Sequence, residues 1–418
     1  METPKIACFE ITSDEIKLLI GFCLADKPYV LYCGKRPLPK GLIEKGIIKD
    51  EDGLKAELAS FARFQLPEQK LIVNLHEICL ILPPLGLRIY QTRKMTVMSN
   101  VDKKISKIDL ANVIQMAKNE SLPQGEEVVD IIPASYELSD KSVYVNPPLE
   151  VSSDFMYANL FIHALPHTIS SDYRRLCNLA DCHVKKAAVA PYCEALLFAS
   201  DESLPKTYLL IDIGERYSAL TLIGDGRAYR SQSIFEGGAE LSEHIAKNLG
   251  ISFEEAESLK RTFGYAKKRG GYEPSLGKGT KEGSLLEESF TQKDLNEAIE
   301  DYFSSFFKKV SGAIGALSSE SQNDLTQIPI VLTGGGSKLN GIASFFASYL
   351  PSHELHFPSL NYLGTDQREF AAPLGMVIAA SRYTGSLEDN QRGVATVTRT
   401  SPKEKKAERR NLASEDTL

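Results

Sequence analysis

A glycine triplet near residue 334 is the stretch best suited to contact a phosphate-bearing ligand. An apolar run ends there as VLTGGGS, residues 331–337, and a helical pattern follows. Glycines at such a junction let backbone amides approach a ligand because no Cβ stands in the way. A tight strand-to-helix turn would use the same residues. Because such triplets are uncommon after a strand, we predict that Gly334, Gly335 and Gly336 contact a nucleotide.

Two acidic residues occupy matching places at the ends of apolar strands. Asp212 precedes Ile213 and Gly214, and Glu10 ends an earlier apolar run in the same way. An acid beside a glycine turn can hold a hydrated Mg²⁺ next to phosphates, or it can simply cap the turn. Since the two positions correspond, we predict that Glu10 and Asp212 face each other across a cleft and share one metal.

A third pair of residues lies on one expected helix. Glu257 and Lys260 are three positions apart, so they share a helix face. They could flank an adenosine, or they could form a solvated ion pair, and taken alone the spacing favours the ion pair.

The elements that must position these residues follow a repeated pattern. Strands are expected at residues 5–11, 15–23 and 29–35, and again at 208–214, 216–223 and 227–234, so an acid-ended meander occurs twice. Between the copies, residues 82–166 read strand, helix, strand, strand. Residues 294–317 form a long amphipathic helix pattern. The duplication predicts two α/β lobes and a small α+β insert.

Composition narrows the class of protein. The 418 residues carry 48 basic and 55 acidic side chains, a formal charge of −7, which argues against general nucleic-acid binding. The seven cysteines form no Cys-x-x-Cys pair and are expected to be free thiols in a reducing compartment. No signal pattern starts the chain, and no apolar run approaches the roughly 18 residues that span a bilayer. A cytoplasmic location is expected.

These motifs resemble those of the actin, sugar-kinase and heat-shock-chaperone superfamily. Residues 331–341, VLTGGGSKLNG, resemble its adenosine motif, and residues 209–214 and 9–13 resemble its two phosphate motifs. Within the superfamily the chain is most similar to the FtsA family of bacterial cell-division proteins, through GLIEKGIIKD at 41–50 and the insert at 82–166.

The resemblance implies an actin-like, ribonuclease H-like duplicated fold with an FtsA-type insert. Five parts are expected: subdomain IA at 1–81 and 167–206, the inserted, SHS2-like IC at 82–166, IIA at 207–238 and 324–384, IIB at 239–323, and a disordered tail at 385–418.

It also implies a site for ATP with Mg²⁺. Glu10 and Asp212 would be the metal residues. The cofactor-binding residues would be Thr12, Ser13, Gly214, Arg216, Gly238, Glu257, Lys260, Gly334, Gly335, Gly336 and Lys338.

Three departures from the family pattern weaken the phosphate half of that site. Thr12 stands where a glycine is usual, and Glu215-Arg216-Tyr217 stands where Gly-Gly-Thr is usual. Glu215 would repel phosphates, while Arg216 could attract them. Ala190 replaces a glutamate that many actin-like ATPases carry, so no base is evident to orient a water. We expect weak ATP binding with little or no hydrolysis and no catalytic residue; an active ATPase of the same fold is the alternative.

The partners implied by the resemblance are those of a division-ring scaffold. The chain would bind the C-terminal tail of the tubulin-like protein FtsZ through IIB and form filaments through IC. Phe303 and Phe307 are expected in the docking surface, because three phenylalanines within five positions cannot all face inward, and Lys308 and Lys309 would form its basic rim.

A PilM-like component of a pilus or secretion platform is the second interpretation of the same fold. The tail at 385–418 lacks an apolar stripe, so contact with the membrane is expected to pass through another protein. The expected location is the cytoplasmic face of the membrane at the division site.

Overall fold

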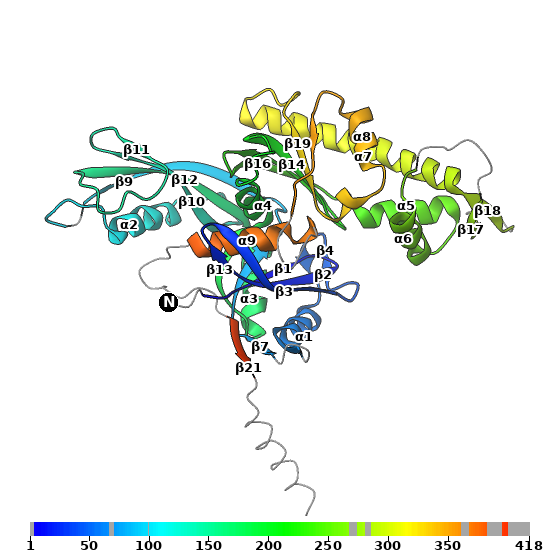
Figure 1. Ribbon diagram of the computed structural model, residues 1–418, viewed down its shortest axis with the longest axis horizontal. Coiled ribbons are helices and arrows are strands. Elements are labelled where there is room, and N and C mark those ends of the chain that lie inside the picture. The colour runs from blue at the N-terminus through cyan, green and yellow to red at the C-terminus, as the bar shows by residue number, and fades with distance from the viewer. Residues whose placement is uncertain are drawn as a thin grey trace, which may run out of the picture.

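The protein consists of two lobes with a cleft between them and an inserted sheet that extends from one side (Figure 1). The computed structural model describes residues 4–66, 71–98, 100–266, 274–280, 286–360, 368–382 and 395–399. No helix within these ranges is long and apolar enough to span a membrane. The duplicated α/β architecture predicted from the two meanders is confirmed.

The first lobe is built on a five-stranded sheet of order β13-β8-β1-β2-β3. Strand β1 is buried along its whole length. It runs antiparallel to β2 and parallel to β8. Helix α9 packs on β1 to β3, and α3 packs on β8 and β13. The bounds are β1 Ile6–Ile11, β2 Glu15–Leu24, β3 Lys27–Pro37, β8 Glu77–Leu82, β13 His183–Val189, α1 Glu51–Ala62, α3 His167–Leu179, α4 Ala190–Phe198 and α9 Ala371–Arg382.

The second lobe repeats this plan with the order β16-β15-β14-β19-β20. Strand β14 takes the place of β1, because it runs antiparallel to β15 and parallel to β19. Helices α5 and α7 pack together, and α7 lies against β15 and β16. The bounds are β14 Thr207–Ile213, β15 Ser218–Gly224, β16 Arg227–Ile234, β19 Ile330–Thr333, β20 Leu355–His356, α5 Gly238–Leu249, α6 Phe253–Thr262, β17 Ser275–Gly279, β18 Glu288–Thr291, α7 Gln292–Ser321 and α8 Ile342–Tyr349.

The insert is a four-stranded antiparallel sheet with one helix and a hydrophobic core of its own. Its order is β11-β10-β12-β9, so β9 lies at one edge. Ser106 and Asp109 cap the helix reciprocally, which starts α2 after a turn. The predicted strand, helix, strand, strand order is found here, with the short β11 added. The bounds are β9 Arg88–Val97, α2 Lys107–Lys118, β10 Glu126–Leu138, β11 Val143–Tyr144 and β12 Phe155–Pro166.

Part of the expected disordered tail is a strand. Residues Ala395–Arg399 form β21, which pairs antiparallel with β7, Leu71–Leu75, beside β6, Arg63–Leu66. The alternating Ala-Thr-Val-Thr-Arg sequence has good β propensity, and β7 offers it an unpaired edge. Residues 383–394 and 400–418 lie outside the described residues.

Candidate functional site

A cavity of about 570 Å³ lies in the cleft between the two lobes. Its walls are the turns after β1, β14 and β19 and the facing parts of α5 and α6. Every residue predicted from the sequence to bind nucleotide or metal lines this cavity: Glu10, Thr12, Ser13, Asp212, Gly214, Arg216, Gly238, Glu257, Lys260, Gly334, Gly335, Gly336 and Lys338. The fold therefore brings together motifs that are up to about 330 positions apart in the sequence.

The glycine triplet joins β19 to a short 3-10 turn, Gly335–Lys338. Gly334 has φ +82° and ψ 174°, a conformation that is nearly restricted to glycine. A Cβ on Gly334 would lie 2.1 Å from Oδ1 of Asp212. The triplet therefore lets the end of β19 approach the acidic end of β14. Helix α8 begins only at Ile342, after a second left-handed glycine, so the single helix expected after the triplet is interrupted.

Glu10 and Lys17 form a buried ion pair at the floor of the cavity. Nζ of Lys17 lies 3.1 Å from Oε2 of Glu10 and 3.7 Å from Oε1 of Glu15. Burial raises the pKa of Glu10 above its ordinary value, and Lys17 offsets part of that shift. Burial also raises the pKa of Asp212, and Lys17 again lowers it. The two acids predicted to share a metal thus face the same lysine.

Sequence analysis missed Glu194, which also reaches this floor. Glu194 is the charged residue of an otherwise apolar helix, α4, and it is 3% exposed. Burial raises its pKa well above the usual range, and Asp212 and Glu10 add to that shift. Sequence analysis treated Ala190 as the position of a missing glutamate. It did not consider Glu194, one helical turn later. A lone glutamate in an apolar helix is a signal that could have found it.

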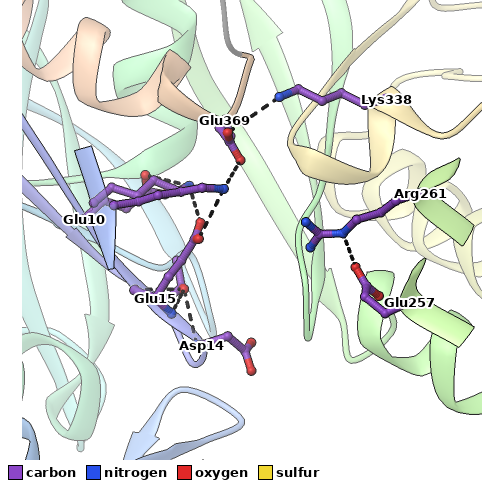
Figure 2. A network of polar contacts seen from close by, with 10 residues as sticks. Glu10, Asp14, Glu15, Glu257, Arg261, Lys338 and Glu369 are labelled. Atoms are coloured by element: carbon purple, nitrogen blue, oxygen red, sulfur yellow. Dashed lines mark hydrogen bonds and ion pairs between the residues drawn. The ribbon is translucent and has the colours of Figure 1, made fainter. Parts of the chain in front are cut away.

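A chain of ion pairs crosses the rim of the cleft (Figure 2). Lys338, from the second lobe, lies 3.6 Å from Glu369, which precedes α9 of the first lobe. Glu369 also accepts from Lys35 at 2.8 Å, and Lys35 lies 3.5 Å from Glu15. Lys338 is therefore engaged by a carboxylate across the cleft.

Arg216 connects the two phosphate-motif turns directly. Its Nε lies 3.5 Å from Oδ1 of Asp14 in the β1–β2 turn of the first lobe. Its Nη1 lies 2.7 Å from Glu243 and 3.5 Å from Glu240, both on α5. Three carboxylates thus surround the guanidinium. A phosphate would have to compete with them for it.

Glu257 and Lys260 form the ion pair that their spacing favoured, and both line the cavity. Nζ of Lys260 lies 2.6 Å from Oε2 of Glu257 and donates to the carbonyl of Gly238 at 2.7 Å. Ser242 donates to Glu257 at 2.5 Å. The pair lines the cavity and is largely buried, at 10% and 17% side-chain exposure, so it is not a solvated pair.

The expected aromatic docking surface on α7 is wrong. Phe303 and Phe307 are 3% and 1% exposed. Phe303 stacks on Phe345, and Phe307 stacks on Tyr349, because α8 packs on the side of α7 that the helical pattern left without a partner. Lys308 and Lys309 are exposed as predicted, and Lys309 pairs with Glu236 at the end of β16.

Family models match two parts of the chain. The model described as the SHS2 domain inserted in FtsA matches residues 86–163, which is the inserted sheet. The model of the MreB/Mbl protein matches residues 199–353, which holds most of the second lobe.

Curated relatives match over most of the chain. The cell division protein FtsA of Bacillus subtilis (strain 168) is 22% identical over 385 residues, which cover 89% of this chain and 82% of that protein. FtsA of Enterococcus faecalis (strain ATCC 700802 / V583) is 23% identical over 354 residues, 83% of this chain and 76% of that protein.

Solved structures share the fold at low identity. The type IV pilus biogenesis complex PilM–PilN contains a chain with a TM-score of 0.56 and 16% identity, covering 90% of this chain and 98% of that chain. MreB5 of Spiroplasma citri bound to AMPPNP has a TM-score of 0.53 and 14% identity, covering 94% and 100%.

The two-lobe fold, the cleft and the position of the inserted sheet agree with both sets of matches. The match to the SHS2 domain lies in a chain that aligns with FtsA of Bacillus subtilis over 82% of that protein's length. These matches support an actin-like cell-division protein of the FtsA type.

Proposed function

We propose that the protein is a division-ring scaffold that binds the C-terminal tail of FtsZ, assembles into filaments and binds ATP weakly with little or no hydrolysis. The inserted sheet matched to the SHS2 domain of FtsA supports this proposal most strongly. The sheet extends from the first lobe away from the cleft, where it is open to a neighbouring molecule (Figure 1).

The exposed side chains of the insert support its use in self-assembly. Val97, Val143 and Val145 are each about two-thirds exposed, at 65%, 64% and 66%. Val97 ends β9, which lies at one edge of the sheet, whereas Val143 lies in β11 at the opposite edge and Val145 follows it. An edge strand with an exposed valine can pair with a strand of another molecule. We propose both edges of the insert as filament contacts.

The nucleotide would occupy the cavity described above. Glu10 and Asp212 fit a divalent cation, because both are acidic, both line the cavity and a single nearby ammonium, Lys17, is shared between them. Bound Mg²⁺ would neutralise phosphate charge there. The structure of MreB5 has been solved with AMPPNP and with ADP, which supports nucleotide binding by the same fold in this chain.

Binding is proposed to be weak because carboxylates crowd the phosphate end. Asp14, Glu240 and Glu243 already hold Arg216, and burial raises the pKa of Glu215, whose carboxylate lies beside Gly238. A triphosphate would break these pairs and face several acids at short range. Nucleotide would then tune assembly and would not drive turnover.

The FtsZ tail is proposed to dock on the outer part of the second lobe, residues 239–323. Exposed Lys308 and Lys309 on α7 provide positive charge for an extended, partly acidic segment. The buried Phe303 and Phe307 have no part in this contact. We also propose that another protein attaches the chain to the membrane, at the cytoplasmic face of the division site.

Direct binding tests the proposal against its rivals. Fluorescence anisotropy would compare a labelled FtsZ tail peptide from the same organism with a labelled PilN-type peptide. Binding of the FtsZ tail, weakened when Lys308 and Lys309 are both changed to Glu, supports the scaffold. A matched reversal on the insert, Lys94→Glu, should leave this binding unchanged.

Two outcomes would overturn the proposal. Binding of the PilN-type peptide alone would favour a pilus role, for which the similarity to PilM over 98% of that chain is the supporting observation. Sustained ATP turnover would favour an active ATPase.

A further inference from the structure

Glu194 is a buried carboxylate for which the protein itself supplies almost no partner. Its Oε1 lies 3.5 Å from Oγ1 of Thr333, at the limit of a hydrogen bond, and its Oε2 has no hydrogen-bond partner among the described residues. The side chain lines the cleft cavity. Burying a charged group without a partner costs several kcal/mol, because the group loses its hydration. The alternative is that the buried group takes up a proton and becomes neutral.

The surroundings of Glu194 are short of positive charge. Glu10 and Asp212 are the acids that act on it most strongly, and Lys17 is the cation that acts on it. That cation is also held by Glu10 and Glu15. The floor of the cavity therefore gathers three carboxylates around one ammonium that is already engaged.

Packing alone does not explain a glutamate at this position. Helix α4 reads APYCEALLF, and all its residues are buried. A leucine or a methionine would occupy a similar volume without burying a charge. Thr333, its hydrogen-bond partner, ends β19 directly opposite Asp212 of β14 and directly before Gly334. Glu194 thus extends from the first lobe to the acidic end of the second lobe.

We propose that Glu194 is a third carboxylate of the divalent-cation site, acting with Glu10 and Asp212 through the water shell of the ion. This inference rests on the proposed cation site in the cleft. Within the described residues no three acidic, histidine or cysteine side chains are close enough to hold a metal directly. Mg²⁺ keeps several of its waters in proteins, so carboxylates that accept hydrogen bonds from those waters hold it without direct coordination.

The test is direct titration of the purified full chain with Mn²⁺, alone and with ADP, followed by electron paramagnetic resonance. Mn²⁺ prefers the same oxygen ligands as Mg²⁺ and is visible in this assay. Glu194→Gln keeps the shape of the side chain and removes its charge, and we expect it to weaken Mn²⁺ binding about tenfold or more. Glu126→Gln is the matched control, because Glu126 is a half-buried glutamate on β10 of the insert, outside the residues that line the cavity.

Thermal melting without metal separates this role from a structural one. We expect Glu194→Gln to melt at or above the wild-type temperature, since it removes an uncompensated buried charge. If it melts well below wild type and binds Mn²⁺ normally, Glu194 serves only to contact Thr333 and the proposal is wrong. Should Glu194→Gln fail to fold, Glu194→Asp keeps the charge but withdraws it by one methylene, and unchanged Mn²⁺ affinity in that variant would also reject the proposal.

Failure of this inference is distinguishable from failure of the proposed site. If Asp212→Asn weakens Mn²⁺ binding and Glu194→Gln does not, the cation site stands and Glu194 has no part in it. If the wild-type chain binds no Mn²⁺ with or without ADP, the cation site itself is rejected, and Glu194 with it.

Discussion

Replacing two adjacent glycines by alanine separates the structural use of the triplet from its use in ligand binding. Gly334 and Gly335 follow each other, yet their surroundings differ. A Cβ on Gly334 would lie 2.1 Å from Oδ1 of Asp212 and 2.5 Å from the carbonyl oxygen of Ile213. A Cβ on Gly335 would meet no atom within 4 Å, and Gly335 lines the cavity.

The two substitutions should therefore differ greatly in their effect on stability. Gly334→Ala places an L side chain at φ +82°, which costs about 1–3 kcal/mol in backbone strain. Relieving the clash with Asp212 and Ile213 costs roughly 1–3 kcal/mol more. The sum, about 2–6 kcal/mol, lowers the melting temperature of this 418-residue chain by roughly 2–7 °C. Gly335→Ala should stay within about 0.5 kcal/mol of wild type.

Nucleotide binding should respond in a different way. The methyl group of Gly335→Ala projects into open space that a bound nucleotide would fill, so ADP affinity should fall roughly tenfold or more. Thermal melting and isothermal titration with ADP, on both variants, measure the two effects. Wild-type affinity in Gly335→Ala would show that the triplet serves only the turn. Wild-type stability in Gly334→Ala would refute the argument from its backbone conformation.

Three further predictions follow from the site and the core. Replacing Glu215 and Arg216 together by glycine should tighten ATP binding, as measured by titration. The change removes a carboxylate beside Gly238 and an arginine that is already paired with carboxylates. Weaker binding would instead identify Arg216 as a phosphate ligand. Phe307→Ala should lower the free energy of unfolding in urea by about 3–5 kcal/mol, since the ring is 1% exposed, and a loss under 1 kcal/mol would contradict its place in the core. His163 is buried, and burial lowers its pKa to about 4 from 6.5, so its neutral form is the one the fold keeps. The contribution of neutral His163 to the free energy of unfolding is therefore complete above about pH 6.5 and is lost as the pH falls toward 4. The melting temperature of His163→Gln should therefore change less with pH across that range than the melting temperature of wild type.

The local patterns that sequence analysis used depend on neighbours along the chain. An apolar run that ends at a polar residue and a turn specifies a buried strand wherever the strand is placed, which is why β1, β14 and β19 were anticipated. The repetition of the meander then predicted two lobes. The glycine triplet was recognisable because only glycine suits φ +82° at Gly334.

Other features depend on which segments meet in space. The environment of Glu194 is set by Asp212 and Thr333 of the other lobe. Arg216 is paired with Asp14, about 200 positions earlier in the sequence. A charged residue in a sequence does not reveal which distant group will face it, because charge interactions act through space and follow no periodicity.

The sequence by itself determined the strands, the duplicated lobes, the insert and the cleft residues, because hydrophobic periodicity and glycine conformation are local properties. Tertiary structure alone decided that β21 pairs with β7 and that Glu194 enters the cleft. It also decided that Phe303 and Phe307 of α7 are buried, while Lys308 and Lys309 stay exposed. One helical stripe predicts one buried face, but α7 packs against α5 and the sheet on one side and places Phe303 against α8 on the other.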